Sequence, residues 1–249
     1  MNSRNGQSEG DFGRLIRKSL RLGFEAAYES RYAGIALWIF GSALIFSYYW
    51  VPVCHDWMNE IGRIKTRSGF AFAAVTTALF GGTVPSVLNW HLSRRRGEKR
   101  PVHIVSNTLF WAIKGVEVDL FYILQAKVFG EQIDVWTVFV KTMVDQFVYV
   151  PLLGLLTVVL YFQLRDCHYN FAVFKSQMRH QWIRNRYLPV LISNWLLWIP
   201  AIVLIYCMPL ALQIPVQNLI LCFWVVVLTL MTRQTAREST PKFAGFETE

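Results

Sequence analysis

The strongest constraint on the fold of this chain is a run of 46 residues, 187–232, without a single Asp, Glu, Lys, Arg or His. As one helix this run would extend about 69 Å at 1.5 Å per residue, more than twice the roughly 30 Å core of a bilayer. Pro209 and Pro215 bracket its middle, and a proline removes a backbone donor and disfavours the helix that precedes it. We therefore predict two apolar helices, near residues 189–208 and 212–232, with a reversal between them.

The composition supports a lipid environment for these helices. Of the 249 residues, 54% are apolar and only 16% are charged, whereas a soluble domain carries about 25% charged residues. Two further segments, 33–53 and 69–92, contain no Asp, Glu, Lys or Arg, and each is long enough to cross a bilayer as a helix. The composition therefore excludes a disordered chain and argues against a soluble globular domain.

Segments 103–129 and 135–164 are also apolar enough to cross a membrane, but both carry charges in their interiors. The short break at 130–134, with the sequence Gly-Glu-Gln-Ile-Asp, predicts a hairpin between them. Together with the four segments above, they predict an all-α fold, a polytopic integral membrane bundle of six hydrophobic helices. The interior charges are Lys114, Glu117 and Asp119 in the first segment and Lys141 and Asp145 in the second.

The positions of the positive charges predict the orientation of this bundle. Of the 25 Lys and Arg residues, 19 lie in segments that six spans place on one side of the membrane, and three lie on the opposite side. Such a bias indicates that both termini face the cytoplasm, or the matrix of an organelle. Because the charges flank the spans, their distribution also argues against nucleic acid as a partner. The cationic segments are 1–32, 93–101, 165–186 and 233–249.

One of these cationic segments has the pattern of an interfacial helix. Large apolar residues recur there at helical spacing with Lys and Arg between them, which is typical of an amphipathic helix lying in the membrane interface. We therefore predict an interfacial helix near residues 170–185. The chain ends are expected to be a basic, partly amphipathic segment at 1–32 and a polar tail at 233–249. The apolar residues of the interfacial pattern are Phe171, Phe174, Met178 and Trp182.

The sequence contains none of the common catalytic motifs: it has no GxSxG, HExxH, P-loop or GxGxxG. We therefore expect no enzymatic activity and no cofactor. The four Cys residues form no CxxC pair. The two Cys-His pairs, Cys54-His55 and Cys167-His168, are each adjacent in sequence and lie at a span boundary, so no metal site is expected.

The charges inside the predicted spans are candidate functional residues, because a charged side chain at mid-helix costs about 2.5–3.5 kcal/mol on insertion scales. Lys114 and Glu117 are three residues apart and can pair along one helix face. Asp119 has no such partner in its own segment and needs one elsewhere or a wet cavity. Asp145 has only Lys141. Two interpretations stay open: these charges line a pore, or they form structural pairs.

Prolines inside the spans have the same two interpretations. Pro85, Pro151 and Pro200 each free a backbone carbonyl at membrane depth. Broken helices of this kind line the sites of many transporters, but a proline can also produce a purely structural kink. The sequence excludes neither interpretation.

Two motifs, DQFVYVP at residues 145–151 and NWLLWIP at 194–200, give the chain a family resemblance. They resemble the DQxxxxP and NWxxWP motifs of the small peroxisomal and mitochondrial inner-membrane proteins, the twenty-two-kilodalton peroxisomal membrane protein family. The resemblance covers roughly residues 70–232. Further matching positions are Pro209, Asn218 and Trp224, which keep the family's spacing, and Gly115 with Asp119, which resemble its GPxxHxWY segment with Asp in the place of His.

The resemblance divides the chain into an extra transmembrane helix at 33–53 and a family-like membrane domain at 69–232. We expect Trp195 and Trp198, with Pro200, to set the geometry of their helix and not to form a ligand site, each ring packing on a neighbouring helix while its indole N–H reaches a carbonyl. The family-motif residues expected to be structural are Gly115, Pro151, Trp195, Trp198, Pro200, Pro209 and Trp224.

Members of this family are thought to act as membrane channels or to support organelle membrane homeostasis. The resemblance therefore implies a channel or pore for small solutes, and the alternative is a non-conducting structural or scaffold protein whose buried charges merely pair. The expected partners are the lipid bilayer of a bacterial cytoplasmic membrane or an organelle, small solutes, and a second copy of the chain. The expected interior polar residues are Glu117, Asp119, Asp145, Gln146, Asn194 and Asn218.

Overall fold

The computed structural model describes residues 20–25, 28–94, 103–178 and 182–238. Every regular element in this part of the chain is a helix, which confirms the predicted all-α class. Most of the predicted N-terminal segment and the end of the C-terminal tail lie outside the described residues. In chain order the elements are α2 (Arg31–Trp50), α3 (Pro52–Ser68), α4 (Phe70–Thr77), η1 (Ala78–Thr83), α5 (Val84–Arg94), α6 (Ile104–Phe129), α7 (Val135–Val144), η2 (Asp145–Gly154), α8 (Leu155–Asp166), α9 (Phe171–Gln177), η3 (Ile183–Tyr187), α10 (Leu188–Tyr206) and α11 (Leu210–Glu238), where η denotes a π-helix.

Four helical stretches of the described residues are long and apolar enough to cross a membrane. Each begins and ends within a few residues of a predicted span, because long apolar runs with few or no charges define both. The chain is therefore an integral membrane protein by the character of its helices. The four stretches are Arg31–Trp50, Phe70–His91, Val135–Asp166 and Asn185–Tyr206.

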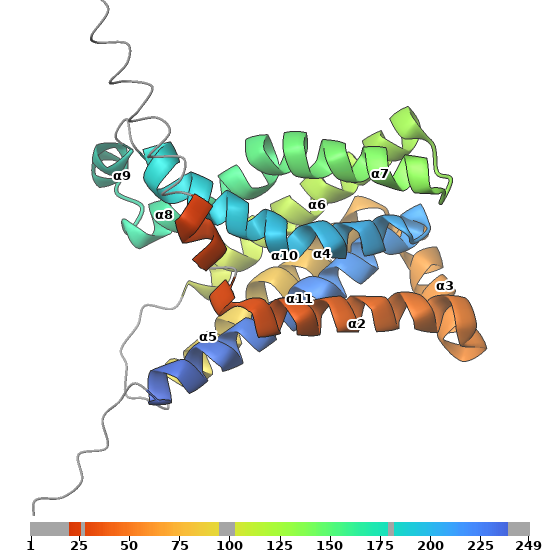
Figure 1. The fold of residues 1–249 in the computed structure, drawn as a ribbon, viewed down its shortest axis with the longest axis horizontal. Coiled ribbons are helices and arrows are strands. Elements are labelled where there is room, and N and C mark those ends of the chain that lie inside the picture. The colour runs from red at the N-terminus through yellow and green to blue at the C-terminus, as the bar shows by residue number, and fades with distance from the viewer. Residues whose placement is uncertain (1–19, 26–27, 95–102, 179–181, 239–249) are drawn as a thin grey trace, which may run out of the picture.

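The predicted number of six spans is not confirmed. α6 has 26 residues, close to the predicted length, but Lys114, Glu117 and Asp119 interrupt its apolar character near the middle, and Lys127 adds a fourth charge. The structure describes the side chains of α11 only as far as residue 226, and the apolar stretch Leu210–Val226 is part of a charge-free run that continues to residue 232. Both helices nevertheless belong to the bundle, since α6 packs against α4 and α11 packs against α2 (Figure 1).

Both predicted reversals are present. The hairpin between α6 and α7 occupies residues 130–134, as predicted, and Gly130 has a φ of 88°, the left-handed region that favours glycine. The second reversal lies at 207–209, between α10 and α11. Pro215 lies inside α11 and does not bracket the turn as expected, because Pro209 alone stands at the break between the two helices.

The interfacial segment is less regular than the helix predicted near residues 170–185. α9 covers only Phe171–Gln177, and η3 is a separate element. Trp182, expected on the lipid-facing stripe, is only 7% exposed and donates its indole N–H to Gln163 Oε1 at 2.5 Å. The apolar stripe therefore ends before Trp182, which finds its partner inside the protein.

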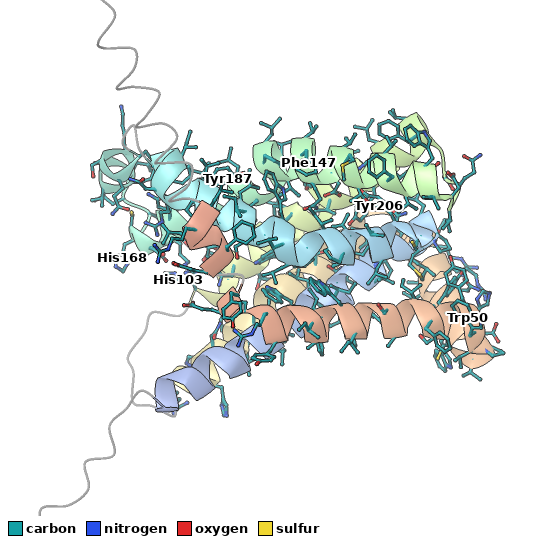
Figure 2. The ribbon with its side chains drawn as sticks, in the orientation of Figure 1. Trp50, His103, Phe147, His168, Tyr187 and Tyr206 are labelled. Atoms are coloured by element: carbon teal, nitrogen blue, oxygen red, sulfur yellow. The ribbon has the colours of Figure 1, made fainter. Side chains whose placement is uncertain are left out.

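The long helices run side by side along one axis (Figure 1). At one end of the bundle lie α3, the hairpin 130–134 and the turn 207–209, and at the other end lie the C-terminal ends of α5 and α8 together with α9. Trp50 marks the first end and His168 marks the second (Figure 2). Segments that the sequence assigned to opposite sides of a membrane therefore lie at opposite ends of the fold.

The extra N-terminal helix is part of the same core as the family-like region. Trp38 of α2 donates its indole N–H to the carbonyl of Leu197 in α10 at 2.9 Å. Tyr49 donates its hydroxyl to the carbonyl of Cys207 at 2.7 Å. α2 also packs along α11, and the main apolar cluster combines residues of α2, α4, α6, α10 and α11. The fold is therefore one bundle from α2 to α11.

Candidate functional site

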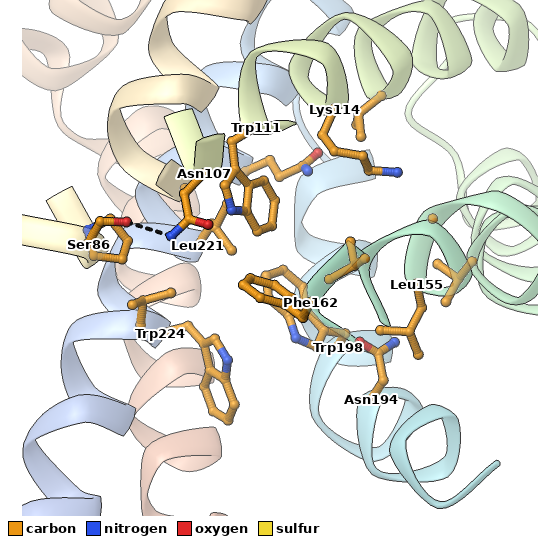
Figure 3. A pocket seen from close by; sticks show the side chains of 18 of the residues that line it. Ser86, Asn107, Trp111, Lys114, Leu155, Phe162, Asn194, Trp198, Leu221 and Trp224 are labelled. Carbon is orange, nitrogen blue, oxygen red and sulfur yellow. Dashed lines mark hydrogen bonds between the residues drawn. The ribbon is translucent and has the colours of Figure 1, made fainter. Parts of the chain in front are cut away.

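A cavity of about 1240 Å³ lies between α5, α6 and α11 on one side and η2, α8 and α10 on the other (Figure 3). Its mouth is at the bundle end that carries α9, where its lining includes the exposed residues Arg94 and His168. Figure 2 places His103, another lining residue, at the same end. The deepest lining residues, Tyr122 and Asp145, are 1% and 2% exposed. The cavity therefore extends from an exposed end of the bundle into its interior.

The deep end of the cavity is closed by a hydrogen-bonded layer of polar side chains, here called the floor. Asp145 accepts a hydrogen bond from the Tyr206 hydroxyl at Oδ2 and one from Gln146 Nε2 at Oδ1, both at 2.8 Å. The Tyr206 hydroxyl accepts from Gln125 Nε2, also at 2.8 Å. These bonds tie η2, α10 and α6 together. The floor consists of Tyr122, Gln125, Asp145, Gln146, Tyr206 and Gln217, and in it Tyr122 donates to Gln217 Oε1 at 2.5 Å.

Asp145 is held by neutral donors and not by Lys141, the partner available to it in sequence. Lys141 Nζ lies 5.9 Å from the centre of the Tyr206 ring, and its side chain is buried. A spacing of four residues brings two side chains together only in a regular α-helix. The backbone N–H of Asp145 still bonds to the Lys141 carbonyl, so the two residues keep this register, and their side chains nevertheless take different partners.

Lys114 and Glu117 form the ion pair predicted from their spacing, with Lys114 Nζ 2.5 Å from Glu117 Oε1. The Tyr149 hydroxyl donates to the same carboxylate oxygen at 2.8 Å. Lys114 also donates to Thr157 Oγ1 at 3.1 Å. The pair therefore connects α6 with η2 and α8, and Lys114 lines the cavity.

Asp119 finds its partner in a distant helix. Its Oδ1 lies 2.9 Å from Nζ of Lys65 in α3, and the two side chains are 1% and 8% exposed. The contact is an ion pair without well-directed hydrogen-bond geometry, since neither oxygen of Asp119 has a hydrogen-bond partner. Asp119 is not among the residues that line the cavity.

The two predicted asparagines have different surroundings. Asn218 is 1% exposed and is held by α4: Thr77 donates to its Oδ1 at 3.0 Å, and its Nδ2 donates to Thr76 Oγ1 at 2.9 Å. Asn194 lines the cavity. The structure thus places three of the predicted polar residues, Asp145, Gln146 and Asn194, on the cavity surface. The other three, Glu117, Asp119 and Asn218, are not among the lining residues, and each is bonded to a second element.

The two family motifs meet in the structure. Trp195 donates its indole N–H to the backbone carbonyl of Gln146 at 2.7 Å, as expected for a ring that packs on a neighbouring helix and finds a carbonyl. Pro151 lies inside η2, and Tyr187 donates to its carbonyl at 2.6 Å. Pro200 lies inside α10, whereas Pro209 precedes α11.

Trp198 and Trp224, also motif residues, line the cavity. Trp198 packs against the apolar core as expected, but in the described part of the chain its indole N–H reaches no carbonyl. Gly115, another motif residue, lies where α6 meets α4: a Cβ there would come within 2.3 Å of the Ala73 carbonyl oxygen. Gly115 therefore sets how closely the two helices approach, which agrees with a structural position.

Sequence reasoning missed several residues of the site. Lys65 is one of the three cations that the sequence assigns to the opposite side of the membrane, between the predicted spans 33–53 and 69–92, yet its segment forms the helix α3 with Lys65 on the buried side. The signal was the amphipathic spacing of 52–68. The floor residues Gln125, Tyr206 and Gln217 stand at none of the motif positions that point to Gln146, Asn194 and Asn218. The described residues contain no group of three or more His, Cys, Asp and Glu that could hold a metal ion.

Comparison with known proteins gives one match. The model of the Mpv17 / PMP22 family matches residues 175–229, which include the NWLLWIP motif, α10 and residues 210–229 of α11. The resemblance predicted from the motifs is therefore confirmed over this segment. No curated protein and no solved structure matches the chain.

Proposed function

We propose that this membrane protein, with the Mpv17 / PMP22 family match in its C-terminal part, is a channel for small solutes whose vestibule is the cavity. The observation that carries the proposal is a space of about 1240 Å³ between the exposed Arg94 and the buried Asp145. A structural bundle of the same helices gains nothing from an unfilled interior, because lost packing contacts cost stability.

The depth of the cavity supports this proposal. Along α6 its lining extends from His103 to Tyr122, which at 1.5 Å per residue is about 28 Å, close to the thickness of a bilayer core. A solute at Tyr122 has therefore passed most of the hydrocarbon region. What remains is the floor, whose side chains close the path by hydrogen bonds that rotamer changes can break.

The helix next to the floor has the irregularity that such an opening requires. η2 is a π-helix of ten residues with Pro151 inside it, and it contributes Asp145 and Gln146 to the floor. π-helical turns and interior prolines are the usual places where helices bend. We place the hinge of the channel in η2.

The orientation follows from the charge distribution of the sequence. The mouth of the cavity lies at the bundle end where the cationic segments 93–101 and 165–186 are attached. The positive-inside rule then directs the mouth to the cytoplasm or the organelle matrix. The membrane in question is a bacterial cytoplasmic membrane or an organelle membrane.

A non-conducting scaffold is the second candidate, and the pairing of the buried charges favours it. Lys65 with Asp119 and Lys114 with Glu117 are both complete pairs. In a scaffold, these pairs and the floor would be permanent, and the cavity would admit a ligand or lipid without passage.

Liposome swelling separates the two candidates. Purified protein with its four Cys replaced is reconstituted, and entry of xylitol and of benzenesulfonate is followed. We expect faster swelling than in protein-free liposomes with at least one of the two solutes. If the protein accelerates swelling with neither solute, the channel proposal is contradicted and the scaffold remains as the candidate.

A blocking experiment assigns any flux to the cavity. Val158 lines the cavity, whereas Leu120 on α6 is 56% exposed and does not. In Val158→Cys, a bulky thiol reagent should reduce the flux by most of its value. The matched variant Leu120→Cys should conduct equally before and after the reagent. Equal block in both variants would locate the path elsewhere.

A further inference from the structure

Three tryptophans from three helices surround the middle of the cavity. Trp111 comes from α6, Trp198 from α10 and Trp224 from α11, and Phe162 of α8 lies between them (Figure 3). We call these four residues the aromatic waist. A solute entering from the mouth must pass or occupy this waist before it reaches the floor.

The three indole N–H groups of the waist are unused donors. None has a hydrogen-bond acceptor in the described part of the chain, unlike Trp38, Trp182 and Trp195, which each donate at 2.5–2.9 Å. None of the three nitrogens is among the fully buried atoms without a partner either, so each keeps accessible surface. An indole N–H donates and cannot accept, so the waist offers three sites for acceptor oxygens.

A cation lies one turn deeper. The Lys114 ammonium has three N–H groups, of which Glu117 and Thr157 take two. Asn194 adds an amide to the lining of the cavity, and this side chain forms no hydrogen bond in the described part of the chain. The polar groups that remain available around the waist are thus mainly donors.

The carboxylates of the cavity are separated from the waist or already occupied. Asp145 lies in the floor with Tyr122, which is 11 residues from Trp111 along α6, about 16 Å at 1.5 Å per residue. Asp166 is at the mouth and pairs with Arg165 at 3.0 Å. A cationic solute would therefore find no free carboxylate at the waist.

The mouth of the cavity attracts anions. Its lining includes Arg94, Arg165, His103 and His168. In sequence, the residues between Arg94 and His103 add four more Lys and Arg and one Glu. A concentration of positive charge at the entrance of a low-dielectric cleft raises the local concentration of anions.

We propose that the aromatic waist binds an organic anion: a sulfonate, carboxylate or phosphate group on an apolar or aromatic body. The acidic oxygens accept from the indole N–H groups of Trp111, Trp198 and Trp224, and the apolar body packs on Phe162 and the indole faces. An organic anion is then the class of solute that the proposed channel carries, and this role of the waist in transport rests on the channel proposal. The anion is a free solute or the head group of an anionic lipid, which share this chemistry.

Binding is measured at equilibrium, so that the result does not depend on flux. The protein in phosphatidylcholine nanodiscs is titrated with benzenesulfonate and, separately, with benzyltrimethylammonium, which has the same ring and the opposite charge. Empty nanodiscs serve as the blank. We expect saturable binding of the sulfonate and none of the ammonium compound.

Three conservative variants test the donors. Trp111→Phe, Trp198→Phe and Trp224→Phe keep an aromatic ring but remove an N–H, and each should weaken sulfonate binding roughly tenfold, the effect of one lost bond to a charged acceptor. Trp136→Phe, at a ring of α7 that is 71% exposed and outside the cavity, is the matched control and should leave binding unchanged. Melting temperatures of all four variants verify that each is folded.

The outcomes separate the alternatives. Weaker binding after addition of phosphatidylglycerol to the nanodiscs identifies a lipid head group as the occupant, and unchanged binding identifies a free solute; both support the proposal. Equal binding of both probes, no sulfonate binding, or binding insensitive to all three waist variants overturns it. The swelling experiment with xylitol is independent of this binding experiment. Its result can contradict the channel proposal without contradicting the anion site, and the binding result can contradict the anion site without contradicting the channel.

Discussion

The indole N–H of Trp195 donates to the backbone carbonyl of Gln146 at 2.7 Å, joining two sequence motifs that lie 49 residues apart. In a π-helix, the N–H of residue i bonds to the carbonyl of residue i−5. The residue whose N–H would bond to the Gln146 carbonyl in this pattern is Pro151, and a proline has no N–H. Trp195 therefore supplies the donor that Pro151 lacks.

This relationship predicts an interaction between the two positions. Trp195→Phe keeps a ring of similar shape but leaves the carbonyl without its donor, and should destabilise the protein by about 1–2 kcal/mol. Trp195→Ala should cost more, about 3 kcal/mol, at the lower end of large-to-small core changes because the ring is half-buried. Thermal unfolding in detergent measures both, with Trp136→Phe as the exposed control.

A double-mutant cycle tests the cause. Pro151→Ala restores an N–H that can reach the Gln146 carbonyl, so Trp195→Phe should cost less in that background than in the wild type. Equal costs in both backgrounds would show that the Trp195 bond does not replace the one that Pro151 lacks.

The Lys65–Asp119 pair predicts a large loss of stability when one partner is neutralised. With exposures of 8% and 1%, removal of one charge leaves the other buried and unpaired, which costs about 3–5 kcal/mol. Asp119→Asn and Lys65→Met should each lower the melting temperature strongly. The double variant Lys65→Met with Asp119→Leu should recover much of the loss.

The control for this pair lies on the same helix. Glu60 and Arg63 form an exposed ion pair at 3.2 Å, and exposed pairs contribute at most about 1 kcal/mol. Glu60→Gln should therefore be nearly neutral. If Asp119→Asn melts normally and changes the ratio of cation to anion flux, Asp119 lines a wet path instead.

Asp134 makes the start of α7 sensitive to acid. Its carboxylate accepts from the Thr137 hydroxyl and from the backbone N–H groups of Trp136 and Thr137, and the Thr137 bonds hold its pKa below the usual value. A carboxylate whose pKa is lowered by folding contributes stability above its unfolded pKa of about 3.9, and loses it as the pH falls through the folded value.

Asp134→Asn keeps a capping side chain but removes the charge. The melting temperature of the wild type should exceed that of the variant at pH 6, and the difference should shrink toward pH 3. Asp56→Asn, at an exposed carboxylate of α3, is the matched control. A difference that stays constant over this range would mean that the charge of Asp134 does not contribute.

The helices could be predicted where charge and proline mark their ends. Residues 130–134 gave the hairpin correctly because Gly130 and Asp134 lie between two apolar runs. α3 was missed because its segment is polar enough to be a loop, and only its packing on α11 determines which of its faces is buried. Local pattern therefore predicts spans well and short amphipathic helices poorly.

Partners across the bundle could not be predicted, because they depend on how helices pack. The bond from Trp195 to a carbonyl was expected, but nothing in the sequence names Gln146 as the acceptor. Asp119 was known to need a partner, and Lys65 lies 54 residues away on a different helix. The cavity is even harder to predict from the sequence. It arises from the separation of α8 from α5 and α11, which no single segment encodes.

The close approach of α4 and α6 predicts that Gly115 cannot be enlarged. A Cβ at this position would lie 2.3 Å from the Ala73 carbonyl oxygen, a backbone atom, so Gly115→Ala must separate the helices. At Gly41 the nearest atom to an added Cβ is the end of the flexible Leu204 side chain, at 3.0 Å. Thermal unfolding should therefore show a marked loss for Gly115→Ala and a small change for Gly41→Ala.

The final prediction concerns which membrane face each end of the bundle occupies. Gln132 and Ala211 lie at the end with α3, whereas Ser93 lies at the end with the cavity mouth. Ser239 lies outside the described residues. The 19 Lys and Arg residues that the sequence assigns to one side of the membrane predict that the mouth end faces the cytoplasm or matrix.

Single Cys probes at these positions, in a chain whose four native Cys are replaced, measure the orientation with an impermeant thiol reagent. The native residues should tolerate Ala or Ser, since Cys54, Cys167, Cys207 and Cys222 are all free thiols. Probes at 132 and 211 should react from the outer face, and probes at 93 and 239 only after permeabilisation. An even number of spans between residues 93 and 239 places both positions on the same face of the membrane. Labelling of these two positions from different faces would therefore show that the number of spans between them is odd. Labelling of all four positions from one face would remove the transmembrane topology itself, and with it the direction proposed for the cavity mouth.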